Sequence, residues 1–338
     1  MQFKKTEELK TGMRLARPIY NKNGVLLYER ASKLTEQGIA SIKNFGLIGI
    51  FILEPAEPVP PMSADDIEFE RFQTVNVFAI KEEMERIAGT GRTARLQMIV
   101  SNIIKNYGHL EKKINFIQNL RSVEDYHHKH ALNVAILCAM MSNQMNLKVE
   151  ERLDVVTAAL LHGIGDYERI DKLCSSNPNV KRYCMQADKI IESEEAGQVD
   201  ASIKLMDGSS ILAVAQVYDN MTAMGLEKPP ETEVTAVRFL MDRDKVYSPA
   251  VVNALINSIN ILGPGVCVEL NTDEKALVLA ENAGNIFRPI ILCFGDNSIM
   301  DLGNQSAYGD VEIADIMKTM DNRHVMDTDM LKKYGFGE

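Results

Sequence analysis

The chain has 338 residues, 46% of them hydrophobic and 25% charged, and its formal net charge at pH 7 is −10. This length predicts two domains, or one large domain with a smaller one attached. The acidic balance disfavours nucleic-acid polymers and anionic membranes as partners, because both would repel the chain. No apolar run reaches the roughly 18 residues of a membrane-spanning helix, and the five cysteines form no C-x-x-C pair. We therefore expect a cytoplasmic protein without disulfide bonds.

The first 56 residues predict a small α+β accessory module. The runs "MRLARPIY" and "IGIFIL" are β-like, and the turn "NKNG" resembles a hairpin signal. Between them, "LTEQGIASIKNFG" places Leu34, Ile39 and Ile42 at near-helical spacing and ends at Gly46, which predicts one short helix. A Pro-rich linker over residues 57–63 then separates this module from the rest of the chain.

Residues 64–300 predict a helical domain with strands at its end. The segment "SADDIEFE" begins with Ser63 and early acidic residues, a helix-start signal, and helical periodicity continues for roughly two hundred residues after it. Near the end, "GVCVELN", "KALVLAE" and "RPIILCF" predict three strands. Residues 301–338 form a tail with one short amphipathic segment, "VEIADIMKTM". The predicted fold class is mainly α, a helical bundle with a short C-terminal β segment.

Four histidines are the candidates for chemistry. His127, His128 and His130 lie together in "EDYHHKHALNVAILCAMM", and His162 ends an apolar helix in "AALLHGIGD". His127 and His130 continue the apolar face of the first helix, so two adjacent helices could bring His130 and His162 together. Such a pair is half of a metal site. The alternative is that these histidines are structural.

The other half of a metal site is missing from the sequence. A hydrolytic two-metal centre needs a carboxylate to bridge its ions, and Gly163, next to His162, has no side chain. Asp166 shares a face with His162 only if a helix continues through Gly163 and Gly165, each of which weakens a helix by about 1 kcal/mol relative to alanine. The candidate metal ligands are therefore His130 and His162, with Asp166 only in a rearranged site. The sequence predicts no catalytic or cofactor-binding residue.

Five blocks of sequence together resemble the HD-GYP domain in order and spacing, over roughly residues 120–295: "HALNVAILCAMM", "AALLHGIGD", "SSILAVAQVYDNMTA", "YSPAVVNALI" and "LGPGVCVELNTDEKALVLAEN". HD-GYP proteins belong to the HD metal-dependent phosphohydrolases and hydrolyse the bacterial second messenger cyclic di-GMP. The resemblance implies an HD-domain-like helical bundle, often preceded by a small N-terminal module.

The departures from the family pattern fall on its metal ligands. The first metal histidine of the family matches His130, and the histidine of its His-Asp pair matches His162. Other family positions are occupied by Tyr126 in place of an acidic ligand, Gly163 in place of the aspartate, Asp166 in place of a lysine, and Gln216 in place of a second aspartate, while Tyr218 and Asp219 are kept. The later histidines and the Gly-Tyr-Pro motif of the family have no counterpart here.

The sequence alone is compatible with three functions. The first is a catalytically inactive signalling module of bacterial cyclic di-GMP pathways, which needs no cofactor and binds a protein partner such as a diguanylate cyclase or a response-regulator pathway component. The second is a residual metal-dependent phosphodiesterase or phosphohydrolase that uses iron or manganese with His130, His162 and Asp166, and with His127 or His128 recruited to the site. The third is a sensor that binds cyclic di-GMP without cleaving it.

Overall fold

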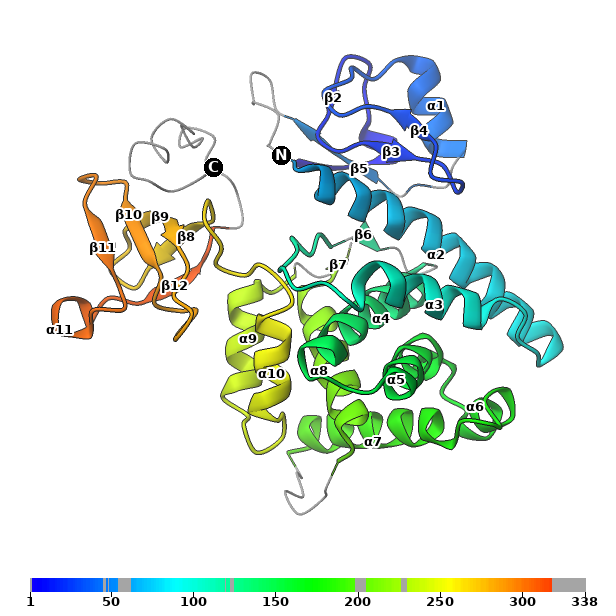
Figure 1. Cartoon of the computed structure of the whole chain (residues 1–338). Coiled ribbons are helices and arrows are strands. Elements are labelled where there is room, and N and C mark those ends of the chain that lie inside the picture. The colour runs from blue at the N-terminus through cyan, green and yellow to red at the C-terminus, as the bar shows by residue number, and fades with distance from the viewer. Residues whose placement is uncertain are drawn as a thin grey trace.

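The computed structural model describes residues 2–44, 47, 49–53, 62–118, 120–121, 125–197, 205–225 and 230–317. Within these residues the molecule is mostly helical, with a small α+β module before the helical body and a five-stranded sheet after it (Figure 1). The fold class predicted from the sequence is confirmed. Most of the Pro-rich linker at 57–63, and the tail from residue 318 onward, lie outside the described residues. No described helix is both long and apolar enough to cross a bilayer.

The N-terminal module is built on short strands around one helix. Its elements are β1 (Gln2–Lys5), η1 (Thr6–Glu8), β2 (Arg14–Leu15), β3 (Ile19–Tyr20), β4 (Leu26–Tyr28), α1 (Glu36–Asn44) and β5 (Gly49–Leu53). Strand β5 lies between β1 and β2 in an antiparallel sheet, and β3 pairs with β4 across the predicted turn "NKNG". Leu15, Ile42 and Ile52 are buried in a small core that belongs to this module alone.

The helical body places α4 at its centre, packed against α5 and α8. Its helices are α2 (Ala64–Thr90), α3 (Leu96–Tyr107), α4 (Tyr126–Gln144), α5 (Val149–Leu161), η2 (His162–Ile164), α6 (Tyr167–Leu173), α7 (Pro178–Glu195), α8 (Asp207–Thr222), α9 (Glu233–Met241) and α10 (Pro249–Ile256). Two short strands, β6 (Leu120–Arg121) and β7 (Met224–Gly225), pair in parallel. Every residue of α4 from 130 to 142 is buried, because helices cover this part of α4 on all sides.

Helix α2 begins and ends where the sequence signals a boundary. The Ser63 hydroxyl accepts a hydrogen bond from the Asp66 N–H at 3.1 Å, and the Asp66 carboxylate accepts one from the Ser63 N–H at 2.8 Å. This reciprocal pair is a capping box, and it satisfies two backbone donors that the first turn leaves unpaired. At the other end, Gly91 adopts a left-handed φ of 65° and its N–H bonds to the Ile87 carbonyl.

Helix α2 also forms hydrogen bonds with the start of α3 and with α6. The Glu83 Oε1 atom accepts hydrogen bonds from the N–H groups of Ala94, Arg95 and Leu96 at 2.7, 3.0 and 3.2 Å, so a side chain of α2 caps the start of α3. Near the C-terminus of α2, the carbonyls of Ile87 and Ala88 accept hydrogen bonds from the guanidinium of Arg169, which lies on α6. The last turn of α2 is therefore held by another helix.

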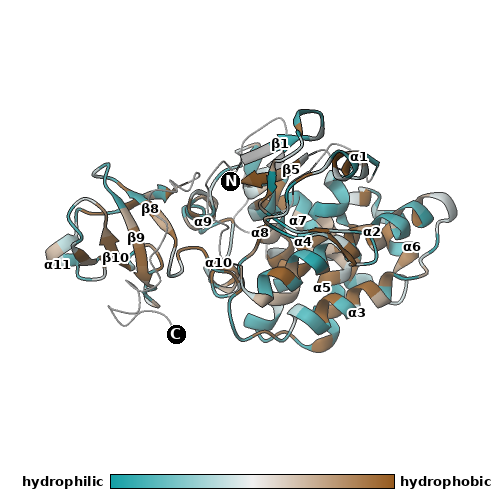
Figure 2. Cartoon of the chain, turned by 90° about the horizontal axis from the view of Figure 1, so that it is seen from above, coloured by the Kyte–Doolittle hydropathy of each residue, from teal (hydrophilic) through white to brown (hydrophobic). Residues whose placement is uncertain are grey.

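The C-terminal sheet confirms the three predicted strands and adds two more. Its elements are β8 (Cys267–Leu270), β9 (Lys275–Ala280), β10 (Ile290–Cys293), β11 (Ile299–Asp301), α11 (Gln305–Tyr308) and β12 (Ile313–Ile316), with strand order β11-β10-β9-β8-β12 and antiparallel pairing throughout. Strands β9 and β10 are mostly hydrophobic (Figure 2). Along β9, Ala276 and Val278 belong to the main core, while Leu277 and Leu279 belong to a second cluster. The strand is thus buried on both faces.

The N-terminal module meets the helical body through a partly buried ion pair, in which the side chains of Arg17 and Glu70 are 23% and 9% exposed. The Arg17 Nε atom lies 3.6 Å from Glu70 Oε1, and Arg17 Nη1 donates a hydrogen bond of 3.4 Å to the Gln118 carbonyl. The same guanidinium lies 4.5 Å above the centre of the Phe51 ring. Burial lowers the pKa of Arg17 and raises the pKa of Glu70, and the attraction between the two charges opposes both shifts.

Candidate functional site

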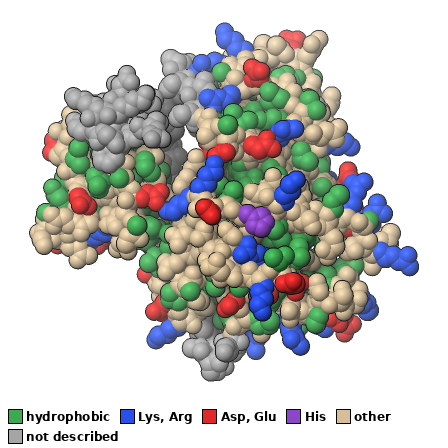
Figure 3. Space-filling view, in the orientation of Figure 1, with side chains coloured by type: hydrophobic (Ala, Val, Ile, Leu, Met, Phe, Trp, Pro, Cys, Tyr) green, Lys and Arg blue, Asp and Glu red, His purple; other side chains and the backbone are tan. Residues whose placement is uncertain are grey.

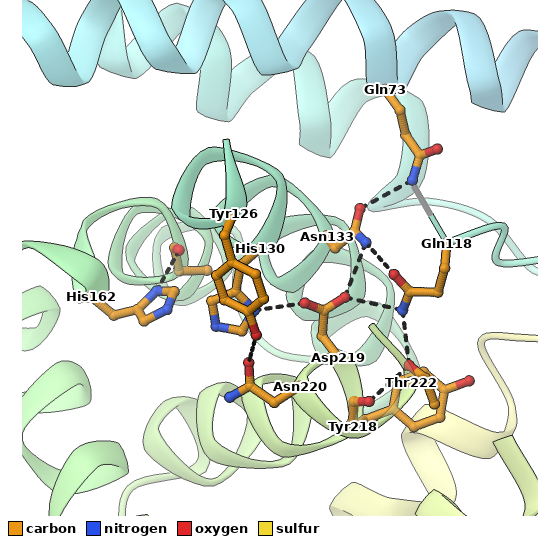
Figure 4. Close-up of polar contacts among 11 residues, drawn as sticks. Gln73, Gln118, Tyr126, His130, Asn133, His162, Tyr218, Asp219, Asn220 and Thr222 are labelled. Atoms are coloured by element: carbon orange, nitrogen blue, oxygen red, sulfur yellow. Dashed lines mark hydrogen bonds and ion pairs between the residues drawn. The ribbon is translucent and has the colours of Figure 1, made fainter. Parts of the chain in front are cut away.

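The structure brings His130 and His162 together. His130 lies in the first turns of α4, and His162 lies where α5 passes into η2. Their ring centroids are 5.1 Å apart, the ring planes meet at 75°, and the side chains are only 7% and 8% exposed. The two helices carry the rings side by side, as the apolar faces in the sequence predict (Figure 4).

His162 is held in one tautomer. Its Nδ1 atom lies 2.8 Å from the Ala159 carbonyl oxygen, and a carbonyl can only accept, so Nδ1 carries the hydrogen. Burial, and to a smaller extent the neighbouring His130, lowers the pKa of His162 to about 3. The ring is therefore neutral near pH 7, with its lone pair on Nε2.

His130 is oriented by a carboxylate. Its Nδ1 atom lies 2.6 Å from Asp219 Oδ2, and Asp219 on α8 is 0% exposed. The other carboxylate oxygen, Oδ1, accepts hydrogen bonds from Asn133 Nδ2 at 3.0 Å and from Gln118 Nε2 at 3.1 Å. Three donors thus converge on this one buried carboxylate, which is how a protein compensates the loss of hydration of a buried charge.

The network around Asp219 extends across four segments of the chain (Figure 4). The Gln118 side chain donates to Thr222 Oγ1 at 2.9 Å, and its own Oε1 accepts from Asn133 at 2.9 Å. Gln73 on α2 donates to Asn133 Oδ1 at 3.0 Å. The network therefore links α2, α4 and α8 with the segment that precedes β6, and its hydrogen bonds reinforce one another in the low-dielectric interior.

Tyr126 covers one side of His130. The two rings are stacked, with centroids 5.8 Å apart and planes at 24°. The Tyr126 hydroxyl donates a hydrogen bond of 2.7 Å to Asn220 Oδ1 on α8. At the position where the family resemblance implies an acidic ligand, this chain therefore has an aromatic ring that packs against the histidine.

The other positions of the implied metal shell supply no further ligand to the histidine pair. A Cβ atom on Gly163 would meet nothing within 4 Å, so this position has open space and no side chain. Gln216 is buried on α8, and its side chain interacts with the Asp188 carboxylate, where it opposes the rise in pKa that burial causes. Asp166 is exposed and caps α6, accepting from the Arg169 N–H at 3.0 Å. Because Gly165 ends the helix with a φ of 67°, Asp166 does not continue the face that carries His162.

His127 and His128 lie outside this pair. His127 is exposed, while His128 is half-buried and its pKa is lowered by burial and by nearby Lys81. On the face shown in Figure 3, acidic and basic side chains are interspersed and a histidine side chain reaches the surface. No concentrated patch of one charge is visible on that face.

The donor set does not fit the iron or manganese centre that an HD-type hydrolase requires. Both histidines use Nδ1 for hydrogen bonds, an arrangement that metal-binding histidines share, and only their two Nε2 atoms remain as possible ligands. Both oxygens of Asp219 already accept hydrogen bonds from side chains. Among the described residues, no group of three His, Cys, Asp or Glu side chains is arranged to hold a metal ion. Two neutral imidazoles without an anionic ligand hold a divalent ion poorly.

The sequence predicts the histidine pair but not the network behind it. Local pattern does not single out Gln73, Gln118 or Asn133, and it marks Asp219 only as a kept family residue. One local signal exists: Asn133 follows His130 by three residues inside an apolar run and is fully buried, and a buried amide requires hydrogen-bond partners.

Comparisons of the chain with protein-family models, with curated proteins and with solved structures find no match.

Proposed function

We propose that this chain is a non-catalytic, HD-GYP-like signalling module that acts in the cytoplasm and binds a protein partner of a bacterial cyclic di-GMP pathway, such as a diguanylate cyclase or a response-regulator component. The proposal rests on the sequence resemblance, which covers roughly residues 120–295, and on the chemistry of the site. Under this proposal the HD-type scaffold is kept for its shape and its chemistry is lost.

One observation carries the proposal. The buried carboxylate beside the histidines, Asp219, accepts hydrogen bonds from His130, Asn133 and Gln118. A carboxylate with this many donors is an anchor for side chains and does not bridge metal ions. Without a metal ion near the histidines, nothing lowers the pKa of a water molecule to make it a nucleophile at neutral pH.

One observation favours the alternative function, a residual metal-dependent phosphodiesterase. The Nε2 atoms of His130 and His162 make no hydrogen bond among the described residues, and both rings are oriented through Nδ1 in the way that metal-binding histidines are. Under this alternative, a metal ion would need these two atoms together with further ligands from solvent or substrate. Metal content and turnover therefore have to be measured on the same sample.

The test uses purified, untagged full-length chain incubated separately with Mn²⁺ and with Fe²⁺ without oxygen. Metal content after desalting and cyclic di-GMP turnover are measured on each sample, and nucleotide binding is measured by calorimetry. We expect metal well below one equivalent per chain and no turnover. The variants are His162→Ala and, as a matched control, His109→Ala, because His109 is exposed and lies outside the site.

Two outcomes would overturn the proposal. Stoichiometric metal with turnover that His162→Ala abolishes and His109→Ala preserves would establish the enzyme. Stoichiometric binding of cyclic di-GMP without cleavage would establish a nucleotide sensor. Co-purification of a diguanylate cyclase or response regulator with the full-length chain, in the absence of both results, would support the proposal directly.

A further inference from the structure

A cavity of about 270 Å³ lies between the start of α2, the end of α3 and the segment after α3. It shares no lining residue with the histidine pair, so any ligand it binds is independent of the proposed function. Asn260, from the connection between α10 and β8, also lines the cavity, and its side chain donates a hydrogen bond of 2.8 Å to Asn115 Oδ1. The cavity therefore lies where the helical body contacts the segment that connects α10 to β8.

Tyr107 is the most informative residue of the cavity. Its side chain lines the cavity, the residue is only 7% exposed, and its ring packs edge-on against Phe69 and Phe72 with centroid distances of 5.6 and 4.9 Å. Its hydroxyl forms no hydrogen bond with any described residue, and it is not sealed from solvent. Because the hydroxyl reaches solvent and has no partner among the described residues, a ligand in the cavity can bond to it without breaking a protein hydrogen bond.

The cavity is lined by three acidic residues, Asp65, Asp66 and Glu68, and by two lysines, Lys112 and Lys113, of which Lys113 pairs with Glu281. Asp65 and Glu68 line the cavity from the first turns of α2, and both raise the pKa of Tyr107, after burial as the main cause. Acidic residues in the first turn of a helix also complement its dipole, and alone they indicate no ligand. Here they flank an unpartnered hydroxyl inside a cavity, and together these groups favour a cation.

The shape and composition of the cavity favour an organic cation over a metal ion. No described group of three His, Cys, Asp or Glu side chains is arranged for a metal, and the third acidic residue, Asp66, already accepts hydrogen bonds from Ser63 and Asn115. The volume lies just below the roughly 300–1,000 Å³ of ordinary small-molecule sites, which suits a small ligand. Phe69 and Tyr107, which are 3% and 7% exposed, also line the cavity and give it an apolar side that suits a short alkyl chain.

We propose that this cavity binds a small primary alkylammonium ligand. Its ammonium group donates hydrogen bonds to the Tyr107 hydroxyl oxygen and pairs with the carboxylates of Asp65 and Glu68, and its alkyl chain lies against Phe69. In the present structure the Lys112 ammonium forms an ion pair with Asp65. Lys112 is itself an alkylammonium group that lines the cavity, so it competes with the ligand for this carboxylate.

Displacing the existing ion pairs costs little. Lys112 and Asp65 are 63% and 67% exposed, and Glu68 pairs at 3.4 Å with Arg71, where both partners are at least half exposed. Exposed pairs of this kind are weak because water screens them. A ligand that also reaches the Tyr107 hydroxyl gains a contact that neither Lys112 nor Arg71 makes.

The test titrates full-length chain with n-butylammonium and, separately, with its neutral analogue 1-butanol, followed by ligand-observed saturation-transfer NMR. We expect saturable 1:1 binding of butylammonium with a Kd of about 1 mM and binding of 1-butanol at least about tenfold weaker. Tyr107→Phe removes only the unpartnered hydroxyl and should weaken butylammonium binding about fivefold without affecting folding. Glu68→Gln should weaken binding to a similar extent, and Lys112→Met should strengthen it.

Glu82→Gln is the matched control, because Glu82 is an exposed acid of α2 outside the cavity, and we expect unchanged affinity. Equal binding of butylammonium and 1-butanol would overturn the proposal. So would wild-type affinity in both Tyr107→Phe and Glu68→Gln, or a Lys112→Met variant that binds no more tightly than the wild type.

Discussion

The Nδ1 atoms of His130 and His162 bond to different partners, and the two residues therefore have different structural roles. A carbonyl oxygen of its own helix holds His162, while a carboxylate from another helix holds His130. His130 therefore belongs to a polar network that ties α4 to α8, whereas His162 is a neutral ring inserted beside it. His162 has a clear consequence for the dependence of stability on pH.

That consequence comes from the lowered pKa of His162, about 3 against an ordinary 6.5. Below pH 6.5 the unfolded chain takes up a proton that the folded chain does not. The contribution of neutral His162 to the free energy of unfolding is therefore complete above pH 6.5 and is lost as the pH falls towards 3. The expected slope is about 1.4 kcal/mol per pH unit inside this window. Urea unfolding at a series of pH values between 4 and 7.5 measures it.

The variants that test this slope are His162→Gln and His109→Gln. Replacing His162 by a neutral amide should remove about 1.4 kcal/mol per pH unit from the pH dependence between pH 4 and 6.5, whatever it does to stability at pH 7. His109 is exposed, so its variant should keep the wild-type slope. An unchanged slope in His162→Gln would contradict the assignment of a buried neutral ring.

At this scale, local pattern predicts the histidines and misses their partners. His130 and His162 each continue an apolar helical face, so their approach results from two amphipathic helices packing together. Asp219 is 89 residues from His130 in the chain, and Gln118 is 101 residues from Asp219. Nothing in the local sequence specifies which polar residues of separate helices will meet, because helix packing decides it.

Among the elements, α3 is the clearest case of a helix whose start is held from outside. It begins after Arg95, which provides no side-chain cap, and Glu83 of α2 accepts hydrogen bonds from three backbone N–H groups there. Glu83→Ala would leave those N–H groups without a protein partner, and Leu96 among them is buried. We expect a loss of about 2 kcal/mol in the free energy of unfolding and faster hydrogen exchange at the amides of residues 94–96.

The neighbouring Glu82 provides the comparison. Its carboxylate bonds to the Arg95 side chain at 3.0 Å, but both partners are more than half exposed. Glu82→Ala should therefore cost less than about 1 kcal/mol and leave exchange at residues 94–96 unchanged. Equal losses in the two variants would mean that the cap contributes no more than a surface ion pair.

Element boundaries with local signals are predicted well, and elements decided by distant pairing are not. Ser63 marks the start of α2, as its side-chain chemistry requires. The segment "VEIADIMKTM" is amphipathic, and period alone does not assign it to a strand. In the structure, Ile313–Ile316 forms β12 because this segment pairs with β8 at one edge of the sheet. The partner lies about 45 residues away in sequence, beyond the range of any local pattern.

For the whole molecule, the Arg17–Glu70 ion pair is one of two charged contacts described between the module and the helical body, beside the hydrogen bond from Arg71 to the Gly24 carbonyl. Arg17→Met should cost about 3 kcal/mol, because it leaves the Glu70 carboxylate buried without this cation. Glu70→Gln in the Arg17→Met background should restore part of the loss. We expect a coupling energy of about 1–3 kcal/mol in the double-mutant cycle, measured by urea unfolding.

Additive losses in the cycle would mean that the two charges do not interact across the junction. The exposed pair of Glu68 and Arg71 provides a matched cycle, because both residues lie on α2 near the junction and their atoms are 3.4 Å apart. That cycle should give a coupling energy below about 1 kcal/mol. The sequence does not predict the junction, because Arg17 and Glu70 are ordinary charged residues until the module docks.

Helix α2 is a long helix that is held at both ends. Its 27 residues, at about 1.5 Å each, make a rod of about 40 Å. The module rests on its first half through Glu70 and Arg71, and its last carbonyls are held by Arg169, a few residues beyond His162. Both ends of this helix are thus tethered, and Gln73 near its middle is held as well, by its hydrogen bond to Asn133. The module therefore reaches the network around the histidine pair by two routes, through α2 and through the hydrogen bond from Arg17 to the Gln118 carbonyl.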